Sequence, residues 1–169
     1  MGKIVNVLGL GSSLELFEGG FCIGVNDIWS KVITDVVVCV DERERFTPER
    51  MATIDGCRPD AFYSHLDDYK DRPDFKRIEL LPYYPDYVCQ LDLVELPKSL
   101  CSPFIACVIA WKYYDAKEIH VYGVDLVNHP NLDRIMCRKI VQHFKTLKIA
   151  LREKGCSLII HGNGILKDI

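Results

Sequence analysis

Short, continuously apolar segments separated by polar turns mark the N-terminal part of the chain. The segments 3–8 (KIVNVL), 21–25 (FCIGV) and 35–40 (DVVVCV) are rich in β-branched residues and predict strands. Each segment stops at a glycine or at polar side chains. Strands that are apolar throughout, and not only at alternate positions, are typical of a parallel sheet covered by helices on both faces.

The C-terminal half repeats a pattern of helix followed by strand. A Ser-Pro pair predicts the start of a helix over 102–114, and 118–122 (EIHVY) predicts the strand that follows it. A long amphipathic helix is predicted over about 132–154, with a last strand at 157–160. This alternation predicts an α/β fold with a doubly wound, mostly parallel sheet, Rossmann-like and three-layered.

The segment between these halves, roughly 47–98, is less regular and contains six prolines. Only 61–65 (AFYSH) and 77–81 (RIELL) are predicted to be strands there. With 169 residues and no linker or repeat, the chain is predicted to be a single domain, 1–169, with 47–98 as an irregular insertion. Three tyrosines of this segment are candidates to stack on a base or to cover the core edge: Tyr83, Tyr84 and Tyr87.

Composition narrows the function classes. The net charge of −3 leaves no basic surplus to attract a phosphate backbone, so a nucleic-acid partner is not expected. The longest apolar run, 104–111, is far shorter than the roughly 20 residues that span a bilayer. Eight cysteines lie mostly in apolar runs without metal-like spacing, which predicts a reduced, cytoplasmic protein with no structural metal. Homo-oligomers are common, so the oligomeric state stays open.

The predicted site lies where polar side chains follow the strands. Ligands of open parallel sheets bind beyond the carboxyl ends of the strands. The candidate binding residues at those ends are Gly9, Gly11, Ser12, Ser13, Asn26, Asp41, Ser102, Asp125 and 161–163 (HGN).

The first turn, 9–13 (GLGSS), is a candidate phosphate site. Its glycines allow a phosphate to approach the backbone, and a helix that begins at Ser12 or Ser13 directs free N–H groups toward an anion. The equally weighted alternative is an ordinary strand–helix turn with a serine cap. Leu14 stands where a dinucleotide fingerprint has its third glycine, so NAD binding is not expected. No GxxxxGK[ST] loop occurs, so ATP hydrolysis is not expected either.

Three further polar residues are candidates for the site. Asn26 is suited to the edge of a base or to a sugar hydroxyl, or it caps the next short helix. Asp41 can reach a ribose, whereas the charged run after it, 42–45, is interpreted as solvated surface. Ser102 is predicted to cap a second helix, whose start would face the first across the sheet and hold a phosphate or diphosphate.

Histidine is the most common general base near neutral pH. His120 and His143 fall inside a predicted strand and a predicted helix, so both are interpreted as structural. His129 and His161 lie in loops and remain candidates for catalysis, with ordinary loop hydrogen bonding as the alternative.

Five segments carry a resemblance to a known family: GLGSSLE, IGVNDIW, CVDER, SPFIACVIAWKYYDAKEIHVYGVDL and KIALREKGCSLIIHGNGIL. In order and spacing, the chain resembles the bacterial sialyltransferases of glycosyltransferase family 42, whose layout is shared by motility-accessory and pterin-diphosphokinase-like proteins. It departs from the family pattern at Leu10, Asp41 and Pro103, where the family has Asn, Asn and Gly.

The resemblance implies roles for individual residues. It implies that Gly9, Gly11 and Ser13 cradle the phosphate of a cytidine nucleotide, and that Ser102 meets the nucleotide from the opposite side. It also implies that Asn26 and Asp41 line the sugar and phosphate site. His129 is the candidate for the family's catalytic histidine.

The sequence therefore predicts a nucleotide- or nucleotide-sugar-binding protein. In its enzymatic form this is a minimal glycosyltransferase with a CMP-sugar donor, in which His129 deprotonates the acceptor hydroxyl. One alternative is a non-catalytic module that binds or sequesters a nucleotide. The other is a diphosphokinase-like phosphotransferase with Mg²⁺ on Asp41 and Asp125.

Overall fold

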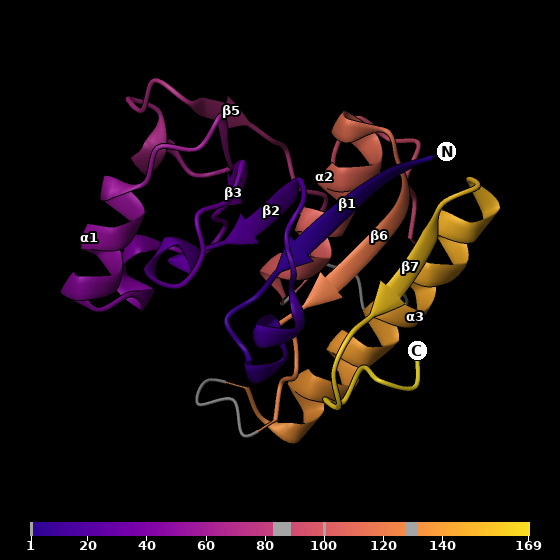
Figure 1. Ribbon diagram of the computed structural model, residues 1–169. Coiled ribbons are helices and arrows are strands. Elements are labelled where there is room, and N and C mark those ends of the chain that lie inside the picture. The colour runs from indigo at the N-terminus through magenta and orange to yellow at the C-terminus, as the bar shows by residue number, and fades with distance from the viewer. Residues whose placement is uncertain (1, 83–88, 100, 128–131) are drawn as a thin grey trace.

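The computed structural model describes residues 2–82, 89–99, 101–127 and 132–169 (Figure 1). Within these residues, seven strands form one sheet in the order β5-β4-β3-β2-β1-β6-β7, and every pairing is parallel. The strands are β1 (Lys3–Leu8), β2 (Cys22–Val25), β3 (Val36–Val38), β4 (Ala61–Ser64), β5 (Phe75–Arg77), β6 (Ala116–Tyr122) and β7 (Ser157–Ile160).

The direction of winding reverses at β1. From β1 the chain moves strand by strand to β5 at one edge, and then returns to place β6 on the other side of β1 and β7 beyond it. Successive residues of β3 face opposite cores: Val36 and Val38 pack with α2 (Ser102–Tyr114) and α3 (Arg134–Glu153), whereas Val37 packs with α1 (Pro48–Gly56) and short 3₁₀ helices. This layering confirms the predicted doubly wound α/β fold.

The two longer helices differ in burial because they differ in pattern. In α2 every residue from Ser102 to Ala110 is buried, as expected for a helix that is apolar on all sides. In α3 the buried apolar residues recur at helical spacing and leave a polar outer face. Phe104 of α2 meets Phe144 of α3 edge to face, with ring centroids 5.8 Å apart.

The structure differs from the expected elements in the irregular segment. The strand expected at 77–81 is wrong in extent, because β5 ends at Arg77 and the chain then turns so that Leu80 and Leu81 pair with Leu96. Helix α1 was not expected; it begins after Thr47, whose side chain caps it, with Pro48 in its first turn. The tyrosines predicted to stack on a base, Tyr83, Tyr84 and Tyr87, lie outside the described residues.

None of the eight cysteines, all of which lie in the described ranges, forms a disulfide, and all except Cys137 are buried. This confirms their interpretation as core residues. Among the described residues, no helix combines the length and the apolar character that crossing a membrane requires.

A pair of histidines lies on the side of β6 and β7 that faces away from α2 and α3. Nδ1 of His120 and Nε2 of His161 are 2.8 Å apart, and the other ring nitrogen of His120 lies 2.7 Å from Oε1 of Glu118. The ring of His161 stacks on that of Tyr122 with centroids 4.2 Å apart. Burial and the neighbouring His120 both lower the pKa of His161, so the fold favours its neutral form.

We expect His161→Gln to weaken the pH dependence of stability. The pKa of His161 is lower in the folded chain than its unfolded value of about 6.5, so the unfolded state binds more protons. The stability that neutral His161 contributes is therefore present above about pH 6.5 and is lost as the pH falls through the folded pKa. Urea unfolding at a series of pH values measures the slope in both proteins. Ser157→Ala, which removes a non-titrating neighbour of Glu118, is the control, and an unchanged slope in His161→Gln contradicts the prediction.

Candidate functional site

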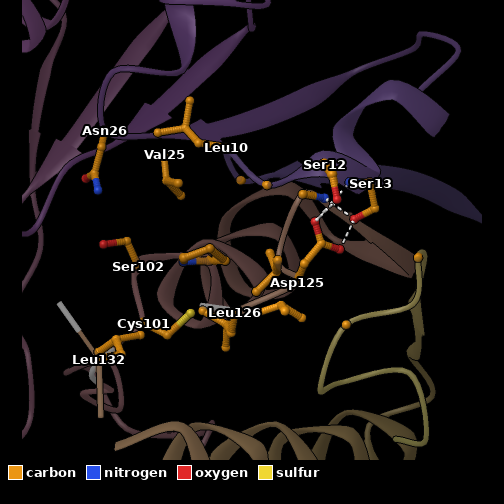
Figure 2. A pocket seen from close by; sticks show the side chains of 18 of the residues that line it. Leu10, Ser12, Ser13, Val25, Asn26, Cys101, Ser102, Asp125, Leu126 and Leu132 are labelled. Carbon is orange, nitrogen blue, oxygen red and sulfur yellow. Dashed lines mark hydrogen bonds between the residues drawn. The ribbon is translucent and has the colours of Figure 1, made fainter. Parts of the chain in front are cut away.

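A cleft of about 900 Å³ opens at the carboxyl ends of the strands and includes the ends of β1 and β6, where the strand order reverses (Figure 2). Such a switch point is the usual ligand site of a doubly wound sheet. His129 lies outside the described residues, and His161 belongs to the histidine pair described above. The predicted residues that line the cleft are Gly9, Gly11, Ser12, Ser13, Asn26, Asp41, Ser102, Asp125, Gly162 and Asn163.

The carboxylate of Asp125, just after β6, binds the donors of the first turn (Figure 2). Its Oδ2 accepts hydrogen bonds from the backbone N–H of Ser13 at 2.9 Å and from the hydroxyl of Ser12 at 3.0 Å. Its Oδ1 accepts a hydrogen bond from the hydroxyl of Ser13 at 2.6 Å. The expectation that the N–H groups at this helix start are all free is therefore wrong, because the N–H of Ser13 donates to a side chain of the protein itself. The helix is also only a five-residue 3₁₀ helix, η1 (Ser12–Leu16).

Asp125 is held in its charged form. Burial alone raises its pKa, but the hydrogen bonds from Ser13 and Ser12 outweigh burial and hold the pKa below its ordinary value. The position where the sequence predicted a phosphate thus carries a permanent negative charge near neutral pH.

The glycines of the site are explained by the packing of the turns against one another. A Cβ atom added at Gly9 would overlap the carbonyl oxygen of Gly123, and one at Gly11 would lie 2.5 Å from Oδ2 of Asp125. Gly162, which has a positive φ of 104°, packs in the same way against Ser13. These glycines let the turns after β1, β6 and β7 meet, a role that requires no ligand.

A second polar cluster consists of Asn26, Asp41 and Ser102. Oδ2 of Asp41 accepts hydrogen bonds from Nδ2 of Asn26 at 3.1 Å and from the hydroxyl of Ser102 at 3.2 Å. Ser102 is therefore not the predicted cap: α2 has Cys101 at its N-cap, with no side-chain capping bond, and the Ser102 hydroxyl turns to Asp41 instead.

The carbonyl oxygen of the Asn26 side chain has no hydrogen-bond partner in the part of the chain that the structure describes. Asn26 has a left-handed backbone, φ 53°, directly after β2, and its amide nitrogen donates to Asp41. Its Oδ1 is buried and accepts no hydrogen bond from the described residues. A buried acceptor without a donor lowers the stability of the fold by about 1–3 kcal/mol. A donor from outside the described chain that bonds to this oxygen would remove that penalty.

Two arginines that the sequence did not point to also line the cleft. Arg45 ends the 3₁₀ helix η3 (Arg43–Arg45); its side chain is 70% exposed and lies 3.7 Å from Oδ1 of Asp41. Arg50 pairs with the buried Asp27 at 2.5 Å and lies over the ring of Phe46. The sequence feature that could have indicated Arg45 is the charged run 41–45 after β3. A turn at the end of this strand brings Arg45 back over the strand ends.

Apolar side chains line the cleft between its polar groups. Figure 2 shows Leu10, Val25, Leu126 and Leu132 among the residues around the opening. This arrangement offers a contact surface for a flat or apolar part of a ligand.

Within the described ranges, no group of three or more His, Cys, Asp or Glu side chains could hold a metal ion. The carboxylates that the phosphotransferase alternative assigns to Mg²⁺, Asp41 and Asp125, each accept hydrogen bonds from neighbouring side chains. A metal on either carboxylate would compete with those donors.

Comparisons with models of protein families, with curated proteins and with solved structures find no match to this chain. The resemblance to the sialyltransferases stays a prediction that rests on the motifs quoted above.

We expect Asp125→Asn to destabilise the protein by about 1.5–3 kcal/mol, the usual contribution of hydrogen bonds to a charged group. The folded pKa of Asp125 lies below its unfolded value of about 3.9, so its contribution is present above that value and is lost as the pH falls through the folded pKa. Urea unfolding of both proteins near pH 7 and near pH 3 measures the difference, which shrinks in acid. Asp92→Asn, at an exposed ion pair with Lys154, is the control, and equal losses in the two variants contradict the assignment.

Proposed function

We propose that this chain binds a nucleotide or a nucleotide sugar in the cleft at the switch point. The observation that carries the proposal is the combination, in one cleft of about 900 Å³, of polar clusters with an apolar surface between them. A nucleotide has the complementary pattern, because a flat base adjoins a sugar and a phosphate that need polar partners. Pockets of about 300–1,000 Å³ are the usual size for small-molecule ligands.

The unpartnered oxygen of Asn26 supports a ligand with hydrogen-bond donors. The amino group of a base and the hydroxyl of a sugar are both donors of this kind. Either group would satisfy Oδ1 of Asn26 and remove the cost of leaving it unpaired. The resemblance to the sialyltransferases favours cytidine nucleotides and CMP-sugars among the candidates.

Glycosyl transfer is the enzymatic form of this proposal and depends on His129 as the base. Under that form, His129→Asn abolishes turnover of a CMP-sugar and leaves its dissociation constant unchanged. If the wild-type protein binds the CMP-sugar without turnover, the non-catalytic module is supported instead. Single-turnover assays and calorimetric titration of both proteins separate the two.

A thermal-shift screen tests the binding proposal. The ligands are CMP, CDP, CTP, CMP-sialic acid, UDP-sugars, GTP, ATP and NAD, each with and without Mg²⁺. We expect at least one nucleotide or nucleotide sugar to raise the melting temperature, since a ligand at 100 times its dissociation constant adds about 2.7 kcal/mol to the folded state. A shift that requires Mg²⁺ favours the phosphotransferase alternative, and no shift with any nucleotide refutes the proposal.

Asn26→Gly tests whether the bound nucleotide uses this cleft. Glycine accepts the positive φ of residue 26 and removes only the amide. We expect the affinity to fall about fivefold to tenfold, the effect of one lost hydrogen bond. The matched control is Asp115→Gly, which changes another left-handed residue, at the C-terminal end of α2. Equal affinities in Asn26→Gly and wild type place the ligand elsewhere.

A further inference from the structure

The charges along the cleft are unevenly distributed. Among the described residues that line it, the acidic side chains are Glu15, Asp41 and Asp125, and the basic ones are Arg45 and Arg50. Both basic side chains come from the segment after β3, on η3 and α1, and Asp41 lies with them. Glu15, on η1, and Asp125, just after β6, belong to the other end. The two ends of the cleft therefore differ in the kind of group they can hold.

The end at the first turn is unfavourable for a phosphate. The N–H of Ser13 and both serine hydroxyls already donate to the carboxylate of Asp125. A phosphate here would compete with that carboxylate for the same donors and would be repelled by its charge. Within the described lining, no basic side chain lies on the turns after β1 and β6. One cation outside the lining, the ammonium of Lys31, donates to the carbonyl oxygen of Leu10 at 3.0 Å.

The other end offers a guanidinium with free donors. Within the described residues, the side chain of Arg45 makes no hydrogen bond, and its one ion pair, with Asp41, is long at 3.7 Å. Asp41 orients this guanidinium without using its N–H groups, because hydrogen bonds require a shorter distance. Arg50 beside it is held by Asp27 through one nitrogen and by the ring of Phe46. Guanidinium groups recognise phosphate oxygens through paired N–H groups.

We propose that Arg45, with Arg50 beside it, is the phosphate-binding group of the cleft, and that the ligand's phosphate lies at this end and not at the first turn. The inference rests on the proposed function and adds the orientation of the nucleotide to it. Because the ribose joins the phosphate to the base, its hydroxyls then lie near Oδ1 of Asn26, whose amide is bonded to Asp41, and the base lies farther along the cleft toward the first turn. The apolar side chains between the two ends contact the base.

Matched nucleosides and nucleotides test this orientation. Calorimetric titration gives, for each nucleoside and its monophosphate, the factor by which the phosphate lowers the dissociation constant. The pairs are cytidine and CMP, uridine and UMP, guanosine and GMP, and adenosine and AMP. In the wild-type protein we expect a factor of about ten or more, the contribution of charge-assisted hydrogen bonds. In Arg45→Gln we expect this factor to fall to about one to three while nucleoside affinity is unchanged.

The matched control is Arg43→Gln. Arg43 lies on the same 3₁₀ helix but pairs with Asp55 and lines a different depression, so its loss removes the same charge without touching the cleft. Arg50 is left unchanged because its loss would leave the buried Asp27 unpaired. Arg45→Glu is the second variant, and we expect it to bind the nucleotide more weakly than the nucleoside.

The outcomes separate this inference from the function it rests on. Failure of all these ligands, and of every nucleotide and nucleotide sugar of the thermal-shift screen, to bind refutes the proposed function, and the orientation with it. If nucleosides and nucleotides bind the wild-type protein equally well, the binding function stands and the phosphate assignment is overturned. A phosphate factor that survives in Arg45→Gln and is lost in Ser12→Ala also overturns it, because the phosphate then lies at the first turn.

Discussion

The carboxylate of Asp125 is the group around which the strand ends are organised. The carboxylate joins the turn after β1 to the turn after β6 through three hydrogen bonds. The backbone carbonyl of Asp125 accepts a further hydrogen bond from the N–H of Ile165. The glycines that surround it have no room for a side chain because the turns approach so closely. One internal anion thus performs the organising role that a bound phosphate has at many helix starts of this fold class.

Most of the sheet could be predicted from the sequence because its strands carry a strong signal. Runs such as those of β2 and β3 are apolar throughout, and a strand buried on both faces requires that pattern. Helix α3 was equally clear from its periodicity. The errors fall where local signals are weak: α1 has little amphipathic character, and the segment after Arg77 changes its pairing partner from β4 to Leu96. Pairing between distant segments leaves no local trace in either one.

The sequence predicted which residues meet at the strand ends but not their contacts with one another. The rule that ligands bind at the carboxyl ends of parallel strands selected Asn26, Asp41 and Asp125, which line one cleft of the structure. The same rule does not say which of these groups form hydrogen bonds with one another. That Asp125 binds the serines of the first turn depends on the distance between two turns far apart in the chain.

The central position of β1 also links the site to the order in which the molecule assembles. Asn6 is paired with Cys22 on one side, close in the sequence, and with His120 on the other, from the last third of the chain. During synthesis the serines of the first turn remain without Asp125 until β6 has emerged, and joining such distant segments is a slow step of folding. The boundary between β1 and β6 borders the cleft, so the cleft is complete only once these two strands have paired. A ligand that spans this boundary therefore stabilises the closed sheet as it binds, so occupancy of the cleft and attachment of the C-terminal strands rise and fall together.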